Sequence, residues 1–415
     1  MTDLDGLSVL IVEPVSGGAA LARAAHRLGA RVVTASQDAG DCEIPAKLRE
    51  IVDEVLVVDT NDEAALAEAV TRLHRRNPFD AVLPGCDFYV ATAARLAARL
   101  GLPGLPVETV DSVRNKALMR ESVTRAGLRS PRFAEADTTD RLRSAAEHVG
   151  FPCVMKPVES SGSIHVSLAR DWPQLLRAFT ELAQDETLDL GRPMGHRVIV
   201  EQYVPGEEIS ADGYVADGVT TVVAVTRKVL GAEPRFVELG HLTPADLPGD
   251  VTDQVKAYTE DVVRALNVTA GPFHCELRLS DQGPVLIELG ARLPGDGIPE
   301  LVKRVTGVDL TLIMLAAGLG ADPRRLGAFG EPVAASAAVR FLTLPEGDSY
   351  SGIKGWDELS DLPNVVETHV AIPPGVPVPE VRDCRSRLAH VLYTADSHRA
   401  ALAFWDSLDE RVVIQ

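Results

Sequence analysis

The sequence predicts a protein of mixed α/β and α+β class that begins with a doubly wound domain. Before residue 110, short apolar runs alternate with helical segments, which is typical of parallel βαβ units. Beyond residue 110 the pattern changes to strand pairs separated by single helices, which is typical of an α+β arrangement. At 415 residues the chain is long enough for two to four domains, each with its own core.

The elements of the first domain follow in regular order. The apolar runs at residues 8–13, 31–35, 54–59 and 80–83 predict buried strands, and helical periodicity is present at residues 19–28, 63–75 and 90–100. The segment VSGG at residues 15–18 could be a phosphate loop, but it lacks the full GxGxxG spacing and the acidic residue that should follow. We therefore expect a structural turn there.

The remaining elements are less regular. Helices are expected at residues 111–126, 172–183, 253–266 and 397–409. Strands are expected at residues 152–157, 197–203, 215–229 (a pair), 271–290 (a hairpin), 334–342 and 365–372. The Gly/Pro-rich stretches 191–195 and 242–249 are expected to be mobile loops.

Composition excludes several classes of function. A net charge of −19 argues against nucleic acid and anionic membranes as partners, although local cations could still bind a small anion. No apolar run approaches the length of a membrane span, and the N-terminus lacks a signal-peptide pattern. The five cysteines are scattered and form no CxxC pair, which indicates thiols in a reducing cytosol. We therefore expect a cytoplasmic protein.

The predicted hairpin at residues 271–290 carries a glutamate in each strand. If residues 280–284 form the turn and Leu279 faces Val285, then Glu276 lies directly opposite Glu288 on one face. Two opposed carboxylates require a cation, and Mg²⁺ is commonly held by one or two carboxylates together with substrate phosphates. Arg292, four residues after Glu288, would share that face in an extended strand. The alternative is a solvated face with a surface ion pair.

Other segments could bind an anion. Lys156 ends an apolar strand and leads into the loop ESSGS at residues 159–163, where an ammonium, N–H groups and hydroxyls could face phosphates. Lys116 opens a helix and could offer a second cation, or could be a solvated helix lysine. Backbone groups at the strand end, residues 201–204, could bind an adenine, and a carboxylate in the acidic stretch that follows could bind a ribose. His274 is interpreted as a core or supporting histidine.

The order of these motifs resembles the ATP-grasp superfamily. Lys116 in NKALMRESVTRAG is followed by KPVESSGS, EQYVPGEEIS, HCELRL and IELGARLPGDG, and the resemblance covers residues 8–340. The stretches ELGH and ELGARLPGDG, with the C-terminal segment, look like the L-amino-acid ligase branch. The resemblance implies an N-terminal pre-ATP-grasp domain at residues 1–110, a small subdomain at 111–200, a large subdomain at 201–330 and a C-terminal α+β segment at 331–415.

The resemblance also implies roles for residues. Those expected to bind ATP are Lys116, Lys156, Ser161, Gly162, Ser163, Glu201, Val204 and Glu208. Those expected to bind one or two Mg²⁺ ions are Glu276 and Glu288, and those expected to line the amino-acid site are Glu238, His241, Arg292 and Gly295. Those expected to act in catalysis are Arg292, Lys156 and His241.

One position departs from the superfamily pattern. Many members carry Glu-x-Asn-x-Arg on the last metal strand, whereas this chain has Gly290 where the asparagine would be. The coordination of a second metal ion therefore stays open. The reaction implied is the joining of two amino acids, by an α or γ linkage, through an acyl phosphate with release of ADP and phosphate. The alternatives are another ATP-grasp ligation or carboxylation, or a nucleotide-binding sensor without turnover; a homodimer is plausible by resemblance.

Overall fold

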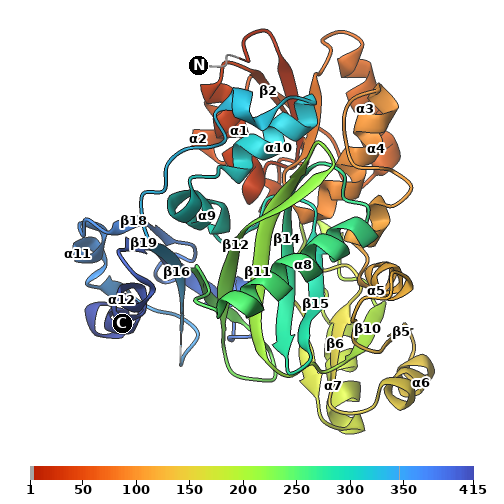
Figure 1. The fold of residues 1–415 in the computed structure, drawn as a ribbon, viewed down its shortest axis with the longest axis vertical. Helices are drawn as coiled ribbons and strands as arrows, with labels where there is room; N and C mark the ends of the chain where they lie inside the picture. Colours follow the sequence, from red (N-terminus) through yellow and green to blue (C-terminus); the bar gives the residue numbers. More distant parts are fainter. Residues whose placement is uncertain (1–3, 345) are drawn as a thin grey trace.

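The computed structural model describes residues 4–344 and 346–415 and contains three main sheets. In Figure 1 the N-terminal sheet lies at the top, a long sheet crosses the centre, and a small sheet lies at the lower right. No helix in the described ranges combines the length and the apolar character needed to cross a bilayer.

The N-terminal sheet is parallel and has the order β3-β2-β1-β4, as the alternating pattern predicts. All five residues of β1 are buried, as expected for a parallel strand covered on both faces. The elements are β1 Ser8–Val12, α1 Gly17–Arg27, β2 Arg31–Ser36, α2 Ala46–Arg49, β3 Glu54–Val57, α3 Glu63–His74, β4 Ala81–Pro84 and α4 Val90–Leu100.

The small sheet is antiparallel, with the order β5-β10-β6-β7, and we call it the lid sheet. The expected helix at residues 111–126 is interrupted: a 3₁₀ turn ends at Val113, and α5 begins only at Lys116 because the Asn115 side chain caps it. The elements are α5 Lys116–Arg125, β5 Phe133–Ala136, α6 Thr139–Val149, β6 Cys153–Pro157, β7 Ser167–Ala169, α7 Trp172–Ala183 and β10 Val198–Gln202.

The central sheet has eight antiparallel strands in the order β15-β14-β11-β12-β13-β16-β19-β18. Because β13 pairs with β16, this sheet is continuous across residue 330. The strands are β11 Glu207–Ala216, β12 Val219–Leu230, β13 Glu238–Thr243, β14 Gly271–Ser280, β15 Gly283–Gly290, β16 Ser336–Thr343, β18 Val365–Val370 and β19 Arg387–Ala395. The helices are α8 Gly249–Ala265, α9 Ile298–Thr306, α10 Leu310–Leu319, α11 Trp356–Ser360 and α12 His398–Arg411.

Helix α10 joins the central and N-terminal parts. Its sequence LTLIMLAAGL is apolar at nearly every position, which indicates a helix covered on all sides. Leu310, Ile313 and Leu315 pack in one core with Leu21 and Ala24 of α1. Figure 1 shows α10 beside α1. The N-terminal sheet is therefore fixed above the central sheet by a continuous apolar contact.

Two stretches expected to be mobile contain strands instead. Residues Arg192–Pro193 form β9, which pairs with β8 at Leu188–Asp189. The stretch at 242–249 begins inside β13, where Leu242 pairs with both Arg227 and Ala338. Residues 244–248 lie between β13 and α8 outside helix and strand, and the mobility of both stretches stays a prediction. Two further short strands are β17 Ile353–Lys354 and β20 Val413–Ile414.

The hairpin of β14 and β15 pairs Glu276 with Glu288, but by a different register from the one predicted. At the turn Leu279 faces Pro284, one residue away from the expected Val285. A bulge at Ile287 then adds one residue to β15 and restores the pairing of the two glutamates. The bulge also frees the Ile287 carbonyl, which accepts hydrogen bonds from Arg120 Nη2 at 2.6 Å and Lys156 Nζ at 3.4 Å.

Candidate active site

A solvent-open pocket lies between the lid sheet and the central sheet, with an empty volume of about 760 Å³. Most of the residues predicted to bind ATP, metal or substrate line it together, although they come from different parts of the chain. They are Lys116, Lys156, Ser161, Gly162, Ser163, Glu201, Val204, Glu208, Glu238, Glu276 and Glu288.

Lys116 is a buried residue whose ammonium points into this pocket. Its Nζ lies 2.8 Å from the Ser160 carbonyl and 3.0 Å from Glu288 Oε1. The solvated alternative for Lys116 is therefore wrong, since only 2% of the residue is exposed. Lys116 therefore connects the start of α5 with the ESSGS loop and with the hairpin of β14 and β15, which we call the metal hairpin because it carries the two predicted Mg²⁺ ligands.

Lys156 lies on the lid side of the pocket, at the end of β6. Its Nζ contacts Glu201 Oε2 at 2.8 Å, and Arg120 Nε contacts the other oxygen of Glu201 at 2.8 Å. Burial alone raises the pKa of Glu201, but the two cations outweigh burial and hold that pKa below its usual range. The Glu201 carboxylate was expected at the adenine; the structure shows it paired with these two cations in the wall of the pocket.

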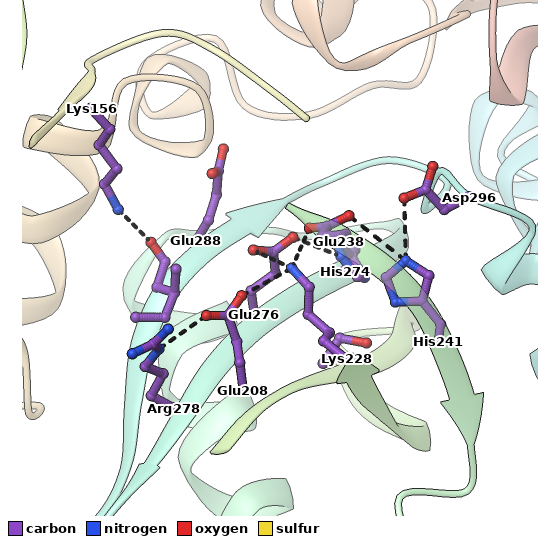
Figure 2. Close-up of polar contacts among 12 residues, drawn as sticks. Lys156, Glu208, Lys228, Glu238, His241, His274, Glu276, Arg278, Glu288 and Asp296 are labelled. Carbon is purple, nitrogen blue, oxygen red and sulfur yellow. Dashed lines mark hydrogen bonds and ion pairs between the residues drawn. The ribbon is translucent and has the colours of Figure 1, made fainter. Parts of the chain in front are cut away.

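Lys228 of β12 is surrounded by three carboxylates on the central sheet. Its Nζ lies 2.6 Å from Glu238, 2.9 Å from Glu276 and 3.2 Å from Glu208, and Figure 2 shows the three side chains converging on it. Burial lowers the pKa of Lys228, but the carboxylates reverse this and raise it well above its usual value. From the sequence, Lys228 was expected only as a cation at a strand end that could support an anion site; its three partners could not be foreseen because they lie on three other strands.

His274 supports Glu276 from the same strand. Its Nε2 lies 3.1 Å from Glu276 Oε1 and its Nδ1 lies 2.6 Å from Asp212 Oδ1. Figure 2 shows His274 beside Glu276. Although burial opposes the charged form, Asp212 and Glu276 raise the pKa of His274 to about 9. The interpretation of His274 as a supporting histidine is confirmed by these contacts.

Arg278 lies at the far end of the pocket, beside the residues predicted to hold adenosine. It contacts Glu208 Oε2 at 3.0 Å and donates to the Val204 carbonyl at 3.0 Å. Its guanidinium also lies over the rings of Tyr203, at 5.2 Å, and Phe236, at 4.9 Å. The guanidinium and the two aromatic rings therefore present flat surfaces at this end of the pocket, which suits a planar base.

His241 and Asp296 lie behind Glu238. His241 Nε2 is 3.2 Å from Asp296 Oδ2 and 3.7 Å from Glu238 Oε2. Arg387 of β19 contacts the same two carboxylates. The carboxylates of Glu238 and Asp296 and the imidazole of His241 are close enough to one another to hold a cation. Lys228 and Arg387 already neutralise the two carboxylates.

Arg292 comes after the end of β15, so it does not share a strand face with Glu288 as the sequence suggested. Its Nε contacts Asp87 Oδ1 at 2.7 Å, and its Nη1 donates to the Leu293 carbonyl at 2.9 Å. Asp87 also pairs with buried Arg114. A Cβ on Gly290 would lie 3.3 Å from the same Asp87 oxygen, so glycine leaves room for this contact.

Gly295 lies in a neighbouring hollow. That hollow is also lined by Ser16, Asp296, Lys303 and His390. The turn between β15 and α9 therefore separates the pocket from a second depression toward the N-terminal domain.

The two opposed glutamates fit the Mg²⁺ that the fold implies. Glu276 and Glu288 both line the pocket, and ammonium groups already lie against both, Lys228 at 2.9 Å and Lys116 at 3.0 Å. Carboxylate oxygens are the ligands that Mg²⁺ prefers. Gly290 has no side chain to offer as a further ligand.

Several charged residues in or behind the pocket were given no role from the sequence. Their charge was visible, but their partners were not. They are Arg120, Asp212, Arg278, Asp296 and Arg387, of which Arg278 lines the pocket.

Three family descriptions match successive parts of the chain. Residues 22–104 match the ATP-grasp N-terminal domain, residues 149–300 match the ATP-grasp domain, and residues 340–415 match L-amino acid ligase C-terminal domain 2. The chain therefore contains ATP-grasp domains followed by an L-amino acid ligase C-terminal domain.

Individual relatives agree with this assignment. The chain is 28% identical to Uncharacterized protein y4rH of Sinorhizobium fredii, over 87% of this chain and 72% of that protein. It is 26% identical to alanine–anticapsin ligase of Bacillus subtilis, over 61% of this chain and 57% of that ligase. It is 29% identical to dapdiamide A synthase of Enterobacter agglomerans, over 62% of both chains. The chain thus spans about three fifths of the named ligases.

The fold itself is that of an L-amino acid ligase. The crystal structure of L-amino acid ligase from Bacillus licheniformis superposes with a TM-score of 0.84 over 99% of both chains, at 24% identity. Phosphoribosylglycinamide synthetase from Anaerococcus prevotii superposes with a TM-score of 0.73 at 17% identity. Because one fold carries different reactions, the function has to be argued from the pocket.

Proposed function

We propose that this chain is an ATP-dependent carboxylate–amine ligase that joins two amino acids and releases ADP and phosphate. The observation that carries the proposal is the direct pairing of Glu276 with Glu288 in the same pocket as Lys116 and Lys156. Two carboxylates and two buried ammonium groups make a site for a metal-bound polyphosphate. Two relatives, alanine–anticapsin ligase and dapdiamide A synthase, are named for ligation and synthesis, which supports this class of reaction.

ATP would lie along the pocket between the two sheets. Arg278, Tyr203 and Phe236 suit the base, and Lys116, Lys156 and the loop at residues 161–163 suit the phosphates. Gly162 has φ of +64° and Ser163 has φ of +61°, so the loop turns its backbone sharply above the pocket. Loop closure would keep water from an activated acyl group.

The first step would be attack of the substrate carboxylate on the γ-phosphorus, which forms an acyl phosphate as ADP leaves. When bound, Mg²⁺ would neutralise the phosphate charge that develops in this step. Glu276 and Glu288 would hold it, while Lys116 and Lys156 would orient the phosphate oxygens. Arg292 is held by Asp87 and does not line the pocket, so it would have to turn toward the pocket to meet the transferring group.

The second step would be attack of a neutral amine on the acyl carbon, with phosphate as the leaving group. The attacking amine must lose one proton overall. Glu238 lines the pocket and could accept it directly, and His241, which lies 3.7 Å behind Glu238, could take the proton from there. The buried surroundings of His241 would keep the released proton away from solvent.

The test is to measure ADP and phosphate release with Mg-ATP across a matrix of amino-acid pairs, with product masses by mass spectrometry. Release that requires two amino acids, with a product lighter by one water than their sum, supports the proposal. Release with bicarbonate or another single carboxylate would favour a different ATP-grasp reaction. ATP binding with silence across the matrix would contradict the proposal and favour a sensor.

A further inference from the structure

The C-terminal part of the chain contributes one buried cation to the network behind the pocket. Arg387, at the start of β19, contacts Asp296 Oδ2 through Nη1 at 2.8 Å and Glu238 Oε2 through Nη2 at 3.2 Å. Its guanidinium also lies 4.1 Å from the centre of the Phe341 ring. Arg387 is not among the residues that line the pocket, so it can act on a ligand only through these two carboxylates.

The carboxylates of Glu238 and Asp296 both lie close to the imidazole of His241, so they are also close to each other and a cation between them lowers their repulsion. Glu238 Oε2 and Asp296 Oδ2 lie 3.7 Å and 3.2 Å from His241 Nε2. Lys228 pairs with Glu238 through its other oxygen, and among the described residues no lysine contacts Asp296. Two like charges so close repel strongly in a buried setting unless a cation bridges them.

Asp296 also lacks support from secondary structure. It lies in the turn between β15 and α9, in the left-handed region with φ of +57°. A non-glycine residue in this region is strained and persists where its surroundings fix it. The bond from Arg387 is therefore a major constraint on where this turn places Asp296 and its neighbour Gly295.

The same segment of chain reaches the phosphate loop. Cys384, in the 3₁₀ turn Cys384–Ser386, donates its N–H to the Gly162 carbonyl at 3.1 Å. A Cβ added at Gly162 would lie 2.3 Å from Cys384 Sγ, so this contact requires glycine. Residues 384–387 thus touch the loop over the phosphates and the acid pair beside His241.

We infer that Arg387 is a positioning residue, through which the C-terminal part of the chain fixes Asp296 and Glu238 around His241. The inference rests on the proposed function, because it assigns this cluster to amino-acid binding. Without Arg387, Glu238 keeps Lys228 and Asp296 keeps only its contact with His241 among the described residues, so the turn at Asp296 moves away from Glu238. The amino-acid side of the pocket then loses its shape, while the ATP side keeps all its own contacts.

The test is steady-state kinetics of Arg387→Met beside a matched control, Arg340→Met. Arg340 lies on the neighbouring strand β16 and stacks on Trp405 at 5.2 Å, but it pairs with Asp409 on the outer side. For Arg387→Met we expect the KM of an amino acid to rise at least tenfold and the KM of ATP to change less than twofold (about 1.4 kcal/mol per tenfold). For Arg340→Met we expect both KM values within twofold of the wild type.

Two further variants keep the test decisive if Arg387→Met does not fold, as judged by circular dichroism. Arg387→Lys retains a charge that can reach only one carboxylate, so we expect a threefold to fivefold rise in the amino-acid KM. Asp296→Asn removes the partner, and adding Arg387→Lys to it should cause no further rise, because the two residues act as one unit.

The outcomes separate this inference from the proposed function. If the wild type is active and Arg387→Met behaves like Arg340→Met, or raises the ATP KM equally, the inference is overturned and the ligase stands. If the wild type is silent with every amino-acid pair, the proposed function and this inference fall together. A selective rise in amino-acid KM that lysine partly rescues supports the positioning role.

Discussion

Two buried lysines on opposite sides of the pocket lie in opposite electrostatic surroundings. Lys156 on the lid side has one carboxylate partner, Glu201, which it shares with Arg120. Lys228 on the central sheet has three carboxylate partners, and both lysines are 4% exposed (Figure 2). The two lysines are thus equally buried, and they differ in the charges of the residues around them.

The pKa values follow the neighbours. Burial lowers the pKa of Lys156, and Arg120 and Lys116 add to this effect while Glu201 opposes it. Burial also lowers the pKa of Lys228, but its three carboxylates outweigh burial and raise it well above its usual value. The lid side therefore has positive charge to spare for phosphates, and the sheet side has negative charge to spare for a metal ion or an amine. The predictions below test this contrast, in order of expected effect.

The largest effect is expected from Glu288→Gln, which removes a charge from the metal hairpin. We expect the rate of ADP release to fall by roughly a hundredfold to a thousandfold, because a developing phosphate charge would lose its counter-ion. Glu207→Gln is the control, since Glu207 is a half-exposed carboxylate on β11 that pairs with Arg227. Turnover of Glu288→Gln close to that of the control would contradict the metal assignment.

The next effect concerns stability. Lys228→Met leaves three carboxylates near one another without their shared cation, so we expect the free energy of unfolding to fall by about 3–5 kcal/mol. Lys156→Met leaves Glu201 paired with Arg120, so we expect a loss of about 1–2 kcal/mol together with weaker ATP binding. Denaturant unfolding of both variants measures the difference. Equal destabilisation would show that the two surroundings are not as different as the structure indicates.

A pH dependence near neutral and alkaline pH should arise on the sheet side, from His274. The pKa of His274 is raised to about 9 in the folded protein, above its usual 6.5, by Asp212 and Glu276 against the effect of burial. The stabilisation from charged His274 is therefore fully present below about pH 6.5 and is lost as pH rises toward 9.

This dependence is measured as the difference in unfolding free energy between the wild type and His274→Gln, in metal-free buffer from pH 6 to pH 10. We expect the difference to shrink by roughly 3 kcal/mol across that range. A difference that stays constant with pH would show that His274 is neutral in the folded protein.

The smallest effect is expected in the phosphate loop. Ser161→Ala removes one hydroxyl from the lid side, so we expect the KM of ATP to rise about fivefold, as for loss of one hydrogen bond of about 1 kcal/mol. The KM of the amino acids should stay unchanged. Ser144→Ala on α6 is the control, since its hydroxyl bonds only within that helix. A larger change in the amino-acid KM than in the ATP KM would contradict the assignment of this loop to ATP binding.

Part of the site could be predicted because its signals are local. The turn formers and the alternating strands around Glu276 and Glu288 were enough to pair the two glutamates, although the expected register at the turn was one residue off. The bulge at Ile287 restored the pairing, and a bulge leaves little trace in one sequence. Glu201 was found as a pocket residue, but its pairing with Arg120 and Lys156 was not foreseen.

The sequence by itself determined the classes of the domains, the order of the motifs and the superfamily, because hydrophobic periodicity and motif spacing are local properties of the chain. Only the tertiary structure decided which cation meets which carboxylate. Lys116 and Glu288 are 172 residues apart, and Arg387 and Glu238 are 149 residues apart. Such pairs form because separate strands and helices bury their charged ends in one place, where an unpaired charge would be too costly to keep.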